Sequence, residues 1–169
     1  MCRCRNRKQP VSPSPLRILI AAVGRARRGP EEALFRHYLA RMRWHAELRE
    51  IAEARGPTPE AQRREEAGRL RATMPEGARL VALDERGQNI DSVGLATQLG
   101  RWRDDGIRDA TFAIGGAEGL DPALVESADL VIAFGRATWP HMLVRGMLAE
   151  QLYRAETILG GHPYHRGGP

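Results

Sequence analysis

The chain has 169 residues, of which 42% are hydrophobic and 28% are charged, values typical of one water-soluble globular domain. Its longest apolar run, Ile18–Val23, is far shorter than the roughly 20 residues that span a bilayer, so we expect no membrane-spanning helix. The two cysteines, Cys2 and Cys4, exclude a disulfide framework and argue against a zinc site, so we expect no metal.

The net charge of +5 is concentrated at the start of the chain. Residues 1–15 carry four basic residues, three prolines and no acid, and they show no hydrophobic periodicity. We expect them to form a disordered basic leader, followed by a single domain over residues 16–169. Without the leader, 22 basic residues face 21 acidic ones, so bulk charge says little about a nucleic-acid partner. Small residues are missing where a signal peptide would be cleaved, which favours a cytoplasmic protein.

Strand-like and helix-like segments alternate from Leu16 onward. The pattern predicts a buried strand over Leu16–Val23 and an alternating one over Glu47–Glu53. It predicts further strands over Arg79–Leu83, Ala110–Ile114 and Leu130–Phe134. It predicts helices over Glu31–Trp44, Pro59–Met74, Ser92–Arg103 and Pro140–Leu159. This order is typical of an α/β protein with a mostly parallel sheet flanked by helices.

Ligands of open parallel sheets bind beyond the carboxyl ends of the strands. Three junctions therefore stand out: Leu83-Asp84, Ile114-Gly115-Gly116 and Phe134-Gly135-Arg136. The middle one belongs to a GGxxG loop, whose glycines permit positive φ or a close approach of the backbone to a ligand. Its spacing differs from the dinucleotide-binding fingerprint, and on residues alone a tight structural turn and a cofactor loop remain open.

The last predicted helix carries two pairs of polar residues. His141 and Arg145 are four residues apart and share one face, whereas Glu150 and Arg154 have the spacing of an exposed ion pair. Arg145 and Arg154 are nine residues apart, so they point to opposite sides of a straight helix. Either one arginine is structural, or the two serve different subunits.

The chain ends in a mixture of aromatic and basic residues, Tyr164-His165-Arg166. Tyrosine and histidine can stack on a base, and arginine can pair with phosphate. A frayed tail is the alternative.

Taken together, IGGAEG, PHMLVR, EQLYRAETI and the closing PYHR resemble the SPOUT rRNA pseudouridine N3-methyltransferases. The resemblance covers about Leu16 to Arg166 and includes an LDERG turn at Leu83–Gly87. It implies a homodimer whose C-terminal portion forms a trefoil knot, and a 23S rRNA substrate on the ribosome.

The resemblance also implies that S-adenosylmethionine binds within the knot, mostly through backbone groups. The implied cofactor residues are Leu83, Gly115, Gly116, Gly135, Arg136, Ala137, Thr138, Trp139 and Pro140. Family members often have serines and a methionine where this chain has Phe134-Gly135-Arg136-Ala137, which leaves the role of Arg136 open.

The implied reaction needs a base or cations near N3 of the pseudouridine, because a neutral imide nitrogen is a poor nucleophile. The catalytic candidates are His141, Arg145, Arg154, Tyr164, His165 and Arg166, and no single base stands out among them. Two other functions were weighed: a non-catalytic RNA-binding module, and a nucleotide-dependent oxidoreductase that lacks the expected acidic ribose ligand.

Overall fold

The computed structural model describes residues 15–166, the last two of them by their backbone alone. The prediction of a disordered leader therefore lies, except for Pro15, outside the described residues. The side chains of His165 and Arg166, both catalytic candidates, lie outside them as well.

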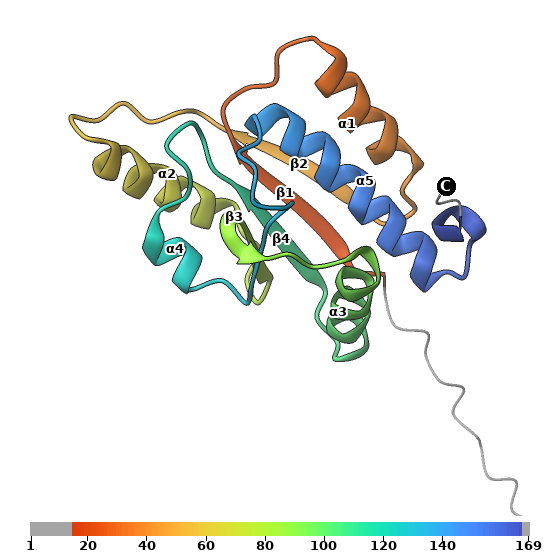
Figure 1. The fold of residues 1–169 in the computed structure, drawn as a ribbon. Coiled ribbons are helices and arrows are strands. Elements are labelled where there is room, and N and C mark those ends of the chain that lie inside the picture. The colour runs from red at the N-terminus through yellow and green to blue at the C-terminus, as the bar shows by residue number, and fades with distance from the viewer. Residues whose placement is uncertain (1–14, 167–169) are drawn as a thin grey trace, which may run out of the picture.

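Five parallel strands form the central sheet, in the order β2-β1-β4-β3-β5 (Figure 1). Their bounds are β1 Arg17–Val23, β2 Ala46–Ile51, β3 Arg79–Gln88, β4 Asp109–Ile114 and β5 Leu130–Ile132. The two neighbours β1 and β4 are almost entirely apolar and buried, as expected for strands that are covered on both faces. The sheet confirms the predicted fold class, and the trefoil knot remains an expectation from the family.

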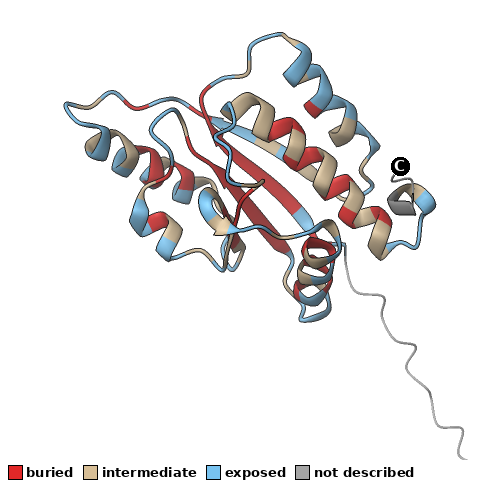
Figure 2. Cartoon of the chain, in the orientation of Figure 1, coloured by how far each residue is buried: buried red, intermediate tan, exposed pale blue. Residues whose placement is uncertain are grey.

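Helices cover both faces of the sheet (Figure 1). On one face lie α1 Pro30–Arg41, α3 Ser92–Asp104 and α5 His141–Leu159, and on the other lie α2 Pro59–Thr73 and α4 Pro122–Glu126. Each layer packs its own hydrophobic cluster against the strands, and the buried residues follow the sheet and the inner faces of the helices (Figure 2). No helix in the described residues is long and apolar enough to cross a membrane.

Local side-chain chemistry explains where several helices begin. The side chains of Thr58, Asp91 and Asp121 accept hydrogen bonds from backbone N–H groups of the first turns of α2, α3 and α4. Proline occupies the first position of α1, α2 and α4, where a missing N–H has no cost.

The structure shifts several of the predicted boundaries by a few residues. The helix predicted to reach Trp44 ends at Arg41, because Met42 adopts an extended conformation. The strand predicted over Leu130–Phe134 ends at Ile132. The long final helix begins at His141, one residue after Pro140, which is its N-cap.

Strand β3 is longer than predicted, because the LDERG segment was interpreted as a turn. After Leu83 the chain departs from β5, and it returns at Gln88, which pairs again with Ile132. Gly87 makes this return possible, since a Cβ atom there would lie 2.6 Å from the carbonyl carbon of Ile132. Two short elements were not predicted: α4 and the 3₁₀ turn η1 Pro163–Arg166.

Candidate functional site

An open cavity of about 820 Å³ lies at the carboxyl edge of the sheet. The loops after β3, β4 and β5 form its walls, so the structure brings together the three junctions singled out in the sequence. Of the predicted cofactor residues, all but Arg136 line it: Leu83, Gly115, Gly116, Gly135, Ala137, Thr138, Trp139 and Pro140. His141, a catalytic candidate, lies at the same cavity.

The glycine loop after β4 depends on close backbone packing at Gly115, and not on positive φ at Gly115 or Gly116. Gly115 and Gly116 do not have positive φ; that conformation occurs at Gly119, where φ is +79°. A Cβ atom on Gly115 would lie 2.5 Å from the carbonyl carbon of Gly119, which leaves no room for a side chain. The hydrogen bond from the N–H of Gly119 to the carbonyl oxygen of Gly116 closes the loop at 3.1 Å. Close packing of backbone on backbone therefore requires the glycine at position 115.

The loop after β5 presents both backbone and an exposed indole to the cavity. Gly135, with φ at +89°, reverses the chain direction there. Trp139 is 42% exposed, and its indole N–H donates to the carbonyl oxygen of Phe134 at 2.9 Å. The side chain of Arg136 is exposed and does not belong to the cavity wall.

Charged residues that the sequence reasoning missed lie on the cavity wall after β3. Asp84, Glu85 and Arg86 line it together with Arg63 from α2. The guanidinium of Arg86 donates to both carboxylate oxygens of Asp84, at 2.8 and 2.9 Å, and this hydrogen bonding lowers the pKa of Asp84. Their position directly after a buried strand was the available signal, but the segment was interpreted as a turn.

His141 is the predicted catalytic residue that lies at the cavity. It is the first residue of α5 and is partly buried. Burial lowers the pKa of its imidazole below the ordinary 6.5, the charge of Arg145 lowers it further, and the carboxylate of Glu53 opposes the shift. At neutral pH the ring is therefore uncharged and can accept a proton.

Arg145 lies one turn further along α5 and serves another purpose. Its side chain is 1% exposed and does not line the cavity. The guanidinium pairs with Glu50 at 2.8 Å and donates to the carbonyl oxygens of Val23 at 2.9 Å and Gly24 at 2.7 Å. These bonds fix the end of β1, and the catalytic role expected for Arg145 remains a prediction.

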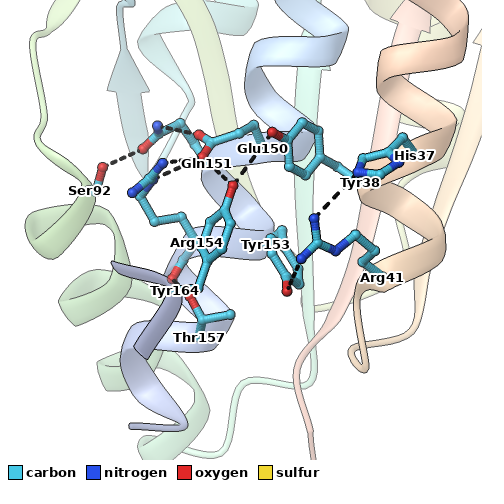
Figure 3. Close-up of polar contacts among 10 residues, drawn as sticks. All are labelled: His37, Tyr38, Arg41, Ser92, Glu150, Gln151, Tyr153, Arg154, Thr157 and Tyr164. Carbon is cyan, nitrogen blue, oxygen red and sulfur yellow. Dashed lines mark hydrogen bonds and ion pairs between the residues drawn. The ribbon is translucent and has the colours of Figure 1, made fainter. Parts of the chain in front are cut away.

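Arg154 and Tyr164 lie at the other end of α5, away from the cavity, in a cluster of tyrosines and arginines (Figure 3). Arg154 forms the expected ion pair with Glu150. The hydroxyl of Tyr164 donates to the same carboxylate at 3.2 Å, and its ring packs edge-on against Tyr153, with centroids 4.8 Å apart. Burial and the neighbouring hydroxyl of Tyr38 raise the pKa of Tyr164, so its phenol stays protonated at neutral pH.

The two arginines of α5 thus point to different regions, as their spacing predicts. Arg145 contacts the end of β1, whereas the guanidinium of Arg154 lies 5.0 Å from the centre of the Tyr164 ring. The tail begins as a 3₁₀ turn that packs against α5 of the same chain. Up to Tyr164, the tail is therefore ordered and not frayed.

Known proteins resemble this chain along most of its length. A family model described as predicted SPOUT methyltransferase matches residues 16–165. The chain belongs to the SPOUT methyltransferase family. A protein from Paramagnetospirillum magneticum named ribosomal RNA large subunit methyltransferase H is 55% identical, over 89% of this chain and 99% of its own. A protein of the same name from Rhodospirillum centenum is 54% identical, with the same two coverages.

A solved structure agrees with the fold of this SPOUT methyltransferase. The crystal structure of a probable methyltransferase from Bordetella pertussis Tohama I superposes with a TM-score of 0.57, covering 83% of this chain and 96% of that one. At 16% sequence identity this similarity concerns the fold alone.

Membership of a methyltransferase family decides against the two other functions weighed from the sequence, an oxidoreductase and a non-catalytic module. Among the described residues, no group of three or more His, Cys, Asp or Glu side chains has the arrangement of a metal site.

Proposed function

We propose that this SPOUT methyltransferase methylates N3 of a pseudouridine in 23S rRNA, on the assembled ribosome in the cytoplasm, with S-adenosylmethionine as the methyl donor. The relatives named ribosomal RNA large subunit methyltransferase H support an rRNA substrate. The observation that carries the proposal is the cavity where three strand-end loops meet beside a neutral histidine.

The residues of this cavity fit S-adenosylmethionine. Its volume of about 820 Å³ lies within the range of about 300–1,000 Å³ that small-molecule and cofactor sites occupy. The loops around Leu83, Gly115 and Thr138 offer backbone N–H and C=O groups to the polar ends of the cofactor. When bound, S-adenosylmethionine supplies an electrophilic methyl group on a positively charged sulfur.

We assign the role of general base to His141. N3 of the pseudouridine ring carries a proton that must leave as the nitrogen forms its bond to carbon. A neutral imidazole at the cavity can accept that proton, and its lowered pKa keeps it unprotonated at neutral pH. Arg145 acts on the site only through the end of β1, as a positioning residue.

The tail completes the site of a partner subunit in this proposal. Arg154 and Tyr164 do not line the cavity of their own subunit. Their cluster holds the start of the tail, so the residues after Tyr164 leave from a fixed point at the far end of α5 (Figure 3). A homodimer that places this end near the partner's cavity would bring His165 and Arg166 to the substrate.

Two measurements test the proposal. Isothermal titration calorimetry should detect S-adenosylmethionine binding to the wild type and none to Gly115→Ala, whose Cβ would displace the backbone at Gly119. Circular dichroism of the variant checks that the fold is retained. Mass spectrometry of rRNA from a deletion strain should show the loss of one methyl group on a pseudouridine. Wild-type protein that binds no S-adenosylmethionine would contradict the proposed cofactor.

A heterodimer tests the shared site. Gly115→Ala and a chain lacking residues 162–169 are co-expressed with different tags, and the mixed dimers are purified. One of the two sites then has both a sound glycine loop and an intact tail, so methyl transfer to ribosomes from the deletion strain should be partly restored. Inactive mixed dimers, beside active wild-type dimers with the same tags, would place the tail in its own subunit's site.

A further inference from the structure

About half of the arginines whose side chains the structure describes have carboxylate partners. Ten of them form ion pairs: Arg17, Arg36, Arg49, Arg63, Arg69, Arg79, Arg86, Arg103, Arg145 and Arg154. An exposed arginine without such a partner is free to bind an anion, because no existing ion pair has to be broken. The location of the unpaired arginines is therefore informative.

Three unpaired arginines follow one another in the short loop between β1 and α1. Arg25, Arg27 and Arg28 are exposed, and their side chains have no hydrogen-bonding or ionic partner in the part of the chain that the structure describes. Two carboxylates lie beside the ends of the loop, Glu53 near Gly24 and Glu31 near Gly29, and neither pairs with these arginines. We name residues 24–29 the arginine loop.

The base of the arginine loop is firmly held. The N–H of Gly24 donates to the carbonyl oxygen of Ile51 at 2.8 Å, and the N–H of Ala26 donates to Oε1 of Glu50 at 2.5 Å. Arg145 binds the carbonyl oxygen of Gly24 and pairs with the same Oε1 atom. The ion pair between the buried Arg145 and the more exposed Glu50 thus anchors a loop whose own arginines have no partner in the described residues.

The arginine loop also begins beside the site. A Cβ atom on Gly24 would lie 3.5 Å from Nε2 of His141, which lines the cavity. The loop follows the carboxyl end of β1, at the same edge of the sheet as the three cavity loops. The loop therefore leaves the sheet beside His141, next to the proposed site.

We propose that Arg25, Arg27 and Arg28 form a phosphate-binding surface that holds the RNA strand next to the target nucleotide. This proposal rests on the proposed rRNA substrate. Guanidinium groups bind phosphate oxygens in a bidentate manner, and such contacts orient a nucleic acid without reading its sequence. The chain from residue 16 onward has a net charge of only +1, so a local cluster is needed to attract RNA.

The experiment compares two triple variants with the same change in charge. Arg25→Ala/Arg27→Ala/Arg28→Ala removes the proposed surface. Arg43→Ala/Arg101→Ala/Arg108→Ala is the matched control: these three arginines are also exposed and without side-chain partners in the described residues, but they lie near the amino ends of the strands. Binding to fluorescently labelled 70S ribosomes from the deletion strain is measured without cofactor. The measurement is repeated at about six KCl concentrations between about 50 and 300 mM.

The loop variant should bind ribosomes about tenfold more weakly at 0.1 M salt, and its salt slope should fall by about 2–3 units, roughly one for each lost phosphate contact. Its S-adenosylmethionine affinity and melting temperature should match the wild type. The control triple should stay close to the wild type in all four quantities. Equal losses in both triples, or no loss in the loop variant, would overturn the proposal.

A lysine variant separates charge from fold. Arg25→Lys/Arg27→Lys/Arg28→Lys keeps three cations and should restore the salt slope; if it behaves like the alanine variant, the surface does not act through phosphate attraction. Binding is measured without methyl transfer, so the two proposals fail separately. If the wild type binds ribosomes but never methylates them, the proposed function is contradicted. The proposal for the arginine loop is then decided by the salt slopes alone.

Discussion

The two ends of α5 place arginines in very different surroundings. At the first end, Arg145 is buried and its guanidinium binds two backbone carbonyl oxygens and one carboxylate. At the other end, Arg154 is partly exposed and shares the carboxylate of Glu150 with Tyr164. Only the first end adjoins the cavity, through His141.

This difference separates the site's parts within one subunit. The first end of α5 places His141, the proposed base, beside the loops proposed to bind the cofactor. The last end joins α1, α5 and Tyr164 through three tyrosines (Figure 3). Substitutions at the first end should change proton transfer and the free energy of unfolding. Substitutions at the last end should lower the rate of methyl transfer and leave S-adenosylmethionine affinity unchanged.

The largest effect is expected from removing residues 162–169. Methyl transfer should fall by roughly a thousandfold, since this deletion removes the polar groups proposed to contact the base in the transition state. S-adenosylmethionine affinity, measured by calorimetry, should remain within about twofold, because described residues of this segment do not line the cavity. A parallel loss of cofactor affinity would mean that the two ends of α5 are not separate.

Substituting the proposed base should have the next largest effect. His141→Ala should slow methyl transfer by about a hundredfold or more, as loss of a general base does. In the wild type, protonation of His141 removes the base, so the rate should fall as pH drops, with its midpoint below 6.5 because the pKa is lowered. His45→Ala, at an exposed histidine, is the control. A wild-type rate that stays flat from pH 7 to 5 would exclude His141 as the base.

Periodicity was sufficient to predict the five strands and the four long helices, because hydrophobic alternation reports burial directly. It also located the cavity, since strand ends of a parallel sheet converge at one edge. The excursion before Gln88 was missed because a backbone packed on Gly87 leaves no periodic signal. α4 is five residues long, too short for a helical repeat to show.

Side-chain roles were less predictable than the fold. The sequence placed Arg145 and Arg154 on opposite faces of a helix but could not say which of them is held by buried contacts. That depended on Glu50 and the end of β1, roughly a hundred residues away along the chain. Likewise, Arg136 belongs to a cavity loop by its position in the sequence. Its side chain nevertheless does not line the cavity, whereas Gly135 and Ala137 do.

A stability comparison distinguishes the two arginines. Arg145→Met should lower the free energy of unfolding by about 3 kcal/mol, because it leaves backbone carbonyls and Glu50 without their buried partner. Arg154→Met should cost about 1 kcal/mol, since that ion pair is partly exposed and screened by water. Urea unfolding followed by circular dichroism gives both values. Equal losses would mean that the ends of α5 are held equally strongly.

The smallest effect on S-adenosylmethionine affinity is expected from substituting Arg136, in the loop that leads into the first end of α5. This arginine lies between Gly135 and Ala137, both on the cavity wall, but its own side chain is exposed and has no partner in the described residues. Arg136→Ala should therefore change S-adenosylmethionine affinity by less than about twofold, because we propose that the loop binds the cofactor through its backbone. Gly135→Ala is the informative neighbour. With φ at +89°, an alanine there is strained by about 1 kcal/mol or more, and the loop should shift and weaken binding. Calorimetry on both variants compares side chain with backbone directly. A tenfold loss in Arg136→Ala, with Gly135→Ala unaffected, would reverse the assignment and make the guanidinium a cofactor contact.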